Sequence, residues 1–129
     1  MPQLSKGGKW IFGWVVVGHN REIRIPPEAC LEYGFQAQDD VLFTRGSRPS
    51  GGFGLGSRQT LAGKPVLPRV FAQGILSGQG RVILPQAVET QPGERLLIGH
   101  GSGLALGFLQ RGPIHEEALY HPELEFFYA

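Results

Sequence analysis

The chain has 129 residues, of which 41% are hydrophobic and 18% are charged, and its formal net charge is +1. This length allows one compact domain or two very small units and excludes a multidomain enzyme. The apolar fraction and the low net charge exclude a disordered chain. The 20 glycines and 10 prolines follow no three-residue period, so they indicate frequent turns between short elements and favour β structure.

The single cysteine, Cys30, excludes an intramolecular disulfide and a zinc site built on paired thiolates. It favours a reducing compartment, and no segment has the pattern of a secretory signal or of a membrane-spanning helix. We therefore expect a cytoplasmic protein with no membrane association. Cys30 lies on the apolar side of a predicted helix, which predicts a buried structural thiol.

Basic and acidic residues are distributed unevenly along the chain. Residues 1–115 carry twelve Lys and Arg and seven acids, a net charge of +5, whereas residues 116–129 carry four acids and no base, a net charge of −4. The stretch from Arg45 to Arg81 contains no acid. Such a stretch suits a polyanion, although solvated charges on an ordinary β protein give the same pattern.

The first half of the chain predicts two strands, a short helix and two further strands. Trp10–Val17 is almost continuously β-branched or aromatic, and Ile23–Ile25 resumes this pattern after a Gly-His-Asn turn. Pro26-Pro27-Glu28 is typical of a helix start and Gly34 of a helix end. Strands over 41–44 and 53–55 complete a β-β-α-β-β order.

The second half repeats this order. Glu22-Ile23-Arg24-Ile25-Pro26 aligns with Arg81-Val82-Ile83-Leu84-Pro85. After the helix, Val41–Ser47 aligns with Leu96–Ser102 at a smaller offset, so the second copy is shorter around its helix. The segment Gln86–Pro92 contains a valine, a threonine and a proline, which allows one helical turn at most.

We therefore expect a single domain over residues 1–129. Its parts are repeat one over 9–56, a polar surface linker over 57–67, repeat two over 68–109, and a short helix with an extended tail over 112–129. Pro122 is expected to end the helix that begins near Ile114.

Two motifs connect the repeats to a known family. Repeat one carries Ile25-Pro26, Glu28, Gly34, Asp39 and the strand Val41–Thr44, and repeat two carries Gly80-Arg81-Val82-Ile83-Leu84-Pro85 followed by Gly93-Glu94-Arg95-Leu96. Both resemble the AbrB/SpoVT/MazE family of swapped-hairpin DNA-binding domains, over roughly two-thirds of the chain.

The resemblance implies a mainly β fold, a swapped-hairpin, double-psi-like β-barrel. In the family two copies of a β-β-α-β-β unit exchange hairpins as a homodimer, so a chain with both copies predicts a single-chain pseudo-dimer. A unit of about 45 residues buries too little apolar surface to be stable alone, which agrees with this expectation. A homodimer of the whole chain stays possible.

The resemblance also implies a DNA-binding transcriptional regulator that needs no cofactor. Alternation places Arg24 on the face opposite to Ile23 and Ile25, so it is expected to point outward. The basic positions of the family helix fall here on Cys30-Leu31 and Glu89-Thr90, which are not basic. The expected contacts to double-stranded DNA are therefore Arg21, Arg24, Arg45, Arg48 and Arg81.

The alternative is a non-enzymatic interaction module or an antitoxin-like protein without DNA binding. Glu123–Tyr128 alternates acids with large apolar residues, as the toxin-binding tails of antitoxins do. This tail can pack on its own barrel, pair with a second copy, or bind a partner protein.

No catalytic or metal-binding residue is expected. His100 has no second ligand at a usual spacing, so it is interpreted as a turn histidine. Ser102 lacks the spacing of a nucleophile elbow. Gly51–Gly56 matches no phosphate-binding loop and predicts a glycine-rich edge strand.

Overall fold

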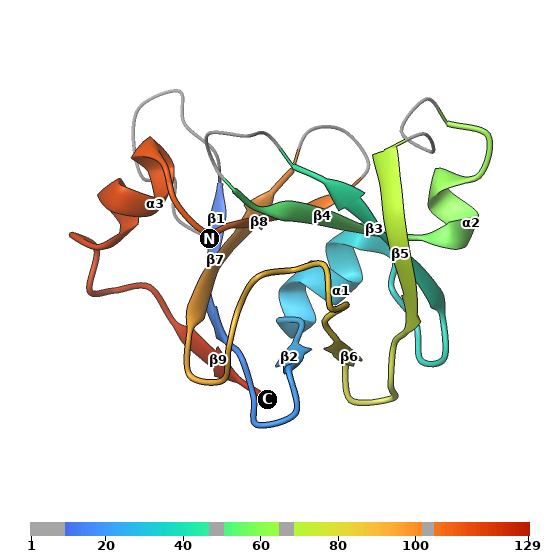
Figure 1. Cartoon of the computed structure of the whole chain (residues 1–129), viewed down its shortest axis with the longest axis horizontal. Coiled ribbons are helices and arrows are strands. Elements are labelled where there is room, and N and C mark those ends of the chain that lie inside the picture. Colours follow the sequence, from blue (N-terminus) through green and yellow to red (C-terminus); the bar gives the residue numbers. More distant parts are fainter. Residues whose placement is uncertain (1–9, 47–50, 65–68, 102–104) are drawn as a thin grey trace.

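The computed structural model describes residues 10–46, 51–64, 69–101 and 105–129, and these form a mainly β fold, as expected (Figure 1). The strands are β1 (Ile11–Val16), β2 (Glu22–Arg24), β3 (Asp40–Arg45), β4 (Phe53–Ser57), β5 (Val70–Ile75), β6 (Arg81–Ile83), β7 (Arg95–His100), β8 (Leu106–Leu109) and β9 (Phe126–Tyr128). The helices are α1 (Pro27–Tyr33), α2 (Arg58–Leu61) and α3 (Pro113–Ala118). None of the helices in these ranges is long and apolar enough to span a membrane.

Seven strands form one mixed sheet in the order β5-β3-β4-β8-β7-β1-β9. All neighbours in it are antiparallel except β1 and β9, which are parallel. The remaining strands, β2 and β6, pair only with each other, in a two-stranded antiparallel ribbon.

The expected closed barrel is not present in the described part of the chain. A barrel requires the first and last strands of a sheet to pair, but here the sheet ends at β5 on one side and at β9 on the other. The physical reason is that the short strands β2 and β6 stay outside the large sheet, and β9 occupies the outer edge of β1.

The strand pairing joins the two halves of the chain. Strand β1 pairs with β7, with Trp14 opposite Leu97, and β5 pairs with β3, with Gln73 opposite Leu42. The sequence alignment of the two repeats places these two pairs at equivalent positions. Each ladder also has a register shift at the corresponding position. Ile11 and Gly13 of β1 lie opposite Gly99 and Ile98, and Val70 and Ala72 of β5 lie opposite Thr44 and Phe43.

The main hydrophobic core joins the large sheet, α1 and the β2–β6 ribbon. Phe43 and Phe108 are among its largest fully buried side chains, and the ring of Phe108 stacks on Phe53 with centroids 4.5 Å apart. Ile23 of β2 and Val82 of β6 are buried in the same core. The ribbon is therefore fixed to the body of the protein through one of its faces.

The segment expected to be a polar linker contains the short helix α2. Ser57 caps it, because its Oγ accepts a hydrogen bond from the Thr60 amide at 3.1 Å, and Leu61 is fully buried. The sequence does not predict this helix, because so short an element with a single buried residue shows no helical period.

The glycine-rich segment forms a central strand, so the expectation of an edge strand was wrong. β4 pairs with β3 on one side and with β8 on the other. A Cβ at Gly54 would collide with Thr44 Oγ1, and one at Gly52 would overlap the Phe108 carbonyl. Glycine is required here because neighbouring strands approach closely, which the sequence alone does not distinguish from a flexible edge.

The C-terminal segment packs on its own sheet. Ala118 of α3 and Leu124 join a second apolar cluster with Ile11, Trp14 and Leu97. Strand β9 then runs parallel to β1, beside the ribbon (Figure 1). Of the three arrangements open to the tail on sequence grounds, the structure shows packing on the same chain.

Candidate nucleic-acid interface

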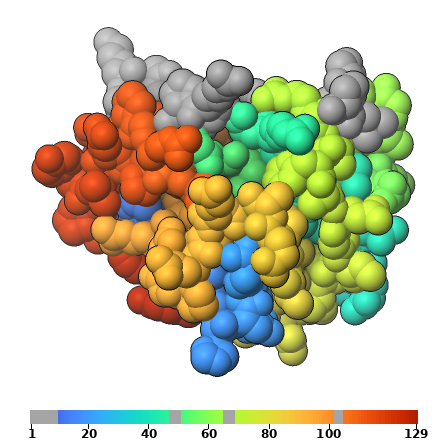
Figure 2. Space-filling model, in the orientation of Figure 1, coloured from blue at the N-terminus to red at the C-terminus, as the bar shows by residue number. Residues whose placement is uncertain are grey.

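The β2–β6 ribbon (Glu22–Arg24 paired with Arg81–Ile83) brings two of the five predicted arginines together. Ile23 lies opposite Val82, and both point into the core. The residues on either side of them therefore point outward, and Arg24 lies directly opposite Arg81. In Figure 2 the blue β2 segment lies at the surface, bordered by yellow residues of the second half of the chain.

Arg24 is half-buried against the C-terminal strand. Its Nε donates a hydrogen bond to the Tyr128 carbonyl at 3.1 Å, and its guanidinium carbon lies 6.0 Å from the centroid of the Phe127 ring. Arg81 is also half-buried, and one of its terminal nitrogens donates to Gln79 Oε1 at 3.2 Å. Neither guanidinium has an ion pair within the described ranges.

Two like charges directly opposite each other in an antiparallel pair destabilise the pairing. Glu22, the one acid in the ribbon, lies opposite Ile83 rather than opposite an arginine. The two guanidinium charges are therefore not neutralised across the ribbon, and a bound anion would relieve their repulsion.

Arg21 has a different environment from the one expected for a DNA contact. Its guanidinium donates to the carbonyls of Thr90, Pro85 and Val88 at 2.6, 2.7 and 2.8 Å. The backbone of Arg21 has a φ of 67°, in the left-handed region, where its counterpart in the second half is Gly80 with a φ of 76°. Arg21 therefore joins the two halves of the molecule and does not present a free guanidinium.

Arg45 does not extend the ribbon surface. Arg45 lies at the end of β3 and lines a groove together with Arg111, Glu89 and Glu94. Its guanidinium carbon is 6.0 Å from the Phe71 ring centroid. Arg48 lies outside the described residues. The predicted arginines that the structure describes thus do not form one continuous face.

Sequence reasoning missed Arg95 of β7, which contacts the C-terminal strand β9 on the large sheet. The guanidinium carbon of Arg95 lies 4.6 Å from the Trp14 ring centroid and 5.7 Å from the Phe126 centroid. It therefore holds β9 against β1 by cation–π contacts. No local pattern indicates this role, because all three residues come from different parts of the chain.

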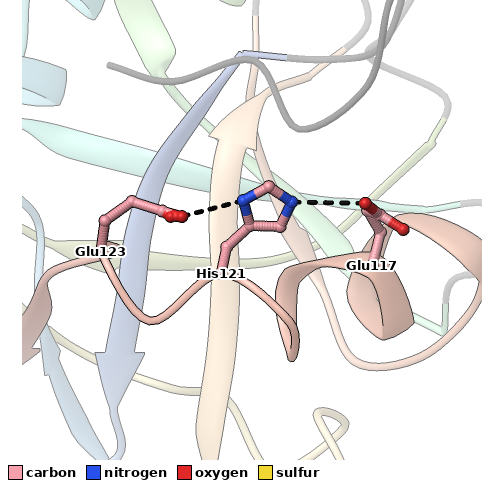
Figure 3. A network of polar contacts seen from close by, with 3 residues as sticks. All are labelled: Glu117, His121 and Glu123. Atoms are coloured by element: carbon pink, nitrogen blue, oxygen red, sulfur yellow. Dashed lines mark hydrogen bonds and ion pairs between the residues drawn. The ribbon is translucent and has the colours of Figure 1, made fainter.

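His100 and His121 form polar contacts with carboxylates, and the ring of His115 packs edge-on against Trp14. His100 is the last residue of strand β7, so its interpretation as a turn histidine was wrong. Its Nε2 lies 2.8 Å from Glu32 Oε2, which connects β7 to α1. His121 lies between Glu117 and Glu123, with ring nitrogens 3.3 and 2.9 Å from their carboxylates (Figure 3). These hydrogen bonds raise the pKa of His121, and we call the three residues the His121 clamp. No cluster of three potential metal ligands occurs in the described part of the chain.

The thiol of Cys30 is only half-buried, less than predicted, with its Sγ 3.9 Å from the Ile25 carbonyl oxygen. Burial nevertheless raises its pKa.

No family model matches the chain, and no curated protein or solved structure is significantly similar to it. The resemblance to the AbrB/SpoVT/MazE family therefore rests on the motif residues alone.

Proposed function

We propose that the protein binds double-stranded DNA through the outward face of the β2–β6 ribbon, with Arg24 and Arg81 as the contacting residues. The observation that carries this proposal is the placement of two arginines directly opposite each other on a surface ribbon, with no acid between them. DNA phosphates supply the negative charge that this pair lacks within the protein.

A two-stranded ribbon has the dimensions to enter the major groove, and arginine binds both phosphate oxygens and the acceptor edge of guanine. The ribbon is held rigidly, since Ile23 and Val82 anchor its inner face in the core. A rigid support lowers the entropic cost of placing two long side chains on a nucleic acid.

We further propose an AbrB-like architecture in which the two halves of one chain exchange hairpins and form a pseudo-dimer. The equivalent registers of the β1–β7 and β5–β3 ladders support this relationship. So do the hydrogen bonds from the Ile25 amide to the Gly80 carbonyl and from the Leu84 amide to the Arg21 carbonyl, at 2.8 and 2.9 Å. In the alignment of the two repeats Ile25 corresponds to Leu84 and Arg21 to Gly80, so each bond is the counterpart of the other.

The test is binding of a mixed-sequence DNA duplex at low salt to the wild-type protein and to Arg24→Ala, Arg81→Ala and the double variant. Each single variant is expected to weaken binding by about fivefold or more. Arg58→Ala is the matched control, because Arg58 is an exposed arginine away from the ribbon. Its Nε lies 3.9 Å from Asp40 Oδ2. Absence of binding, or an equal loss in the control, would contradict the proposal.

The second candidate is a protein-interaction module, and the exposed aromatic pair on the edge strand β9 favours it. Phe126 and Tyr128 are 40% and 62% exposed, and their ring centroids are 6.3 Å apart. Aromatic residues in such positions are enriched in protein interfaces. Failure to bind DNA, together with loss of a copurifying protein on substitution of both rings, would favour this function.

A further inference from the structure

The contacts of Arg24 leave one edge of its guanidinium free. The Nε group donates to the Tyr128 carbonyl, and the Phe127 ring lies beside the guanidinium. Among the residues that the structure describes, the terminal nitrogens Nη1 and Nη2 have no hydrogen-bond or ion-pair partner. Because Nε is already used, this edge is the one left to bind two oxygens of a phosphate or the two acceptors of guanine.

Strand β9 is fixed independently of Arg24, so it can act as a support. The Trp14 amide donates to the Glu125 carbonyl at 2.8 Å, and the strand continues in register to Tyr128 opposite Val16. Leu124 is buried just before it. A side chain at position 13 would bring its Cβ to 2.5 Å from the Glu125 carbonyl oxygen, so Gly13 lets β9 lie this close to β1.

We propose that the C-terminal strand β9 is a positioning element that orients Arg24 so that Nη1 and Nη2 face an incoming phosphate or guanine. This inference rests on the proposed DNA-binding function and adds to it a role for the tail. A free arginine loses rotamer entropy when it binds, whereas an arginine already held by Nε and a ring loses less. The tail is then a part of the binding site and not a separate docking segment.

The test is a double-mutant cycle that combines Phe127→Ala with Arg24→Ala, read out as affinity for a mixed-sequence DNA duplex. Phe127→Ala is expected to weaken binding by about two- to tenfold when Arg24 is present. It is expected to have no effect when Arg24 is already alanine. Tyr120→Ala is the control, because it removes an aromatic ring from the same C-terminal segment that is 81% exposed and lies outside β9. Binding in this variant is expected to stay within about twofold.

Two outcomes of the cycle would overturn the inference. Tighter binding by Phe127→Ala would show that the acidic tail masks the ribbon instead of supporting it. An equal loss with and without Arg24 would show that Phe127 acts through another part of the molecule. If Phe127→Ala fails to fold, Gly13→Ala replaces it, since this change displaces β9 without altering a side chain of the ribbon or the tail.

A second measurement separates this inference from the proposed function. Solvent exchange of the arginine Nε–H groups, followed by NMR without DNA, is expected to be slower for Arg24 than for Arg81 and to become fast in Phe127→Ala. Equal exchange of the two arginines would overturn the positioning role even if DNA binds. Slow exchange at Arg24 without any DNA binding would contradict the proposed function alone.

Discussion

Arg21→Ala is predicted to destabilise the fold strongly, although the sequence alone predicts a surface DNA contact at this position. The side chain reaches from the start of the ribbon to three carbonyl groups that follow β6, at residues 85, 88 and 90. These carbonyls belong to the segment that replaces α1 in the second half of the chain. Removing the guanidinium leaves the carbonyls of Val88 and Thr90 without this donor, whereas the Pro85 carbonyl still accepts a hydrogen bond from the Val88 amide at 3.0 Å.

The magnitude follows from the three hydrogen bonds. A hydrogen bond to a charged group contributes about 1.5–3 kcal/mol, but three bonds that share one guanidinium are not additive. The buried Nε of Arg21 has no partner among the described residues, so its removal offsets part of the loss. We expect the free energy of unfolding to fall by about 2–3 kcal/mol.

Urea unfolding followed by circular dichroism measures this change, with Arg81→Ala as the control. The control is expected to change the free energy of unfolding by less than about 0.5 kcal/mol, as for most surface substitutions. Arg21→Lys is expected to lie between the two, because an ammonium group cannot span all three carbonyls. A loss below about 1 kcal/mol in Arg21→Ala would refute the role of Arg21 as a link between the halves.

Three further predictions concern the tail and the thiol. Gly13→Ala is expected to reduce the hydrogen-exchange protection of β9, whereas Gly93→Ala, which also has a positive φ but no atom within 4 Å of its added Cβ, is expected to leave it unchanged. The pKa of His121 is raised, so the His121 clamp stabilises the tail fully at a pH below the unfolded value near 6.5 and loses this effect as the pH rises through the folded value. Protection of residues 119–125 should therefore fall with rising pH in wild type more than in His121→Gln, after correction for intrinsic exchange. Burial raises the pKa of Cys30, so its alkylation near pH 8 should be several times slower than that of a free cysteine. In urea the alkylation rate should return to that of a free cysteine. Equal rates in the folded and unfolded protein would contradict this prediction.

The mainly β class and the outward direction of Arg24 could be predicted from the sequence. Both depend on short-range features, namely turn residues at short intervals and the two-residue alternation of a strand. The neighbourhood of Arg24 could not be predicted in the same way. It includes Tyr128, more than a hundred positions away, and no local pattern indicates a parallel strand at that distance.

The sequence does contain an indication of the environment of Arg21, but it lies in the comparison of the two repeats and not in the alternation of strand residues. The aligned position in the second half is Gly80, and a glycine in one copy indicates a backbone with positive φ in both. A left-handed residue turns its side chain away from the direction that strand alternation predicts. Gly13 of β1 aligns with Ala72 of β5 in the second half. Strand β9 packs closely beside β1 at Gly13, whereas β5 has no such neighbour, so the glycine present in one copy alone marks the edge where β9 packs.

The salt dependence of DNA affinity tests the central claim most directly. Each phosphate contact contributes about 0.9 to the slope of log K against log salt concentration, so the double variant Arg24→Ala/Arg81→Ala is expected to lower this slope by up to about 1.8. The control Arg58→Ala is expected to leave the slope unchanged. A slope that stays the same in the double variant, or a wild-type protein that does not bind duplex DNA at low salt, would contradict the assignment of the β2–β6 ribbon as the DNA-binding surface.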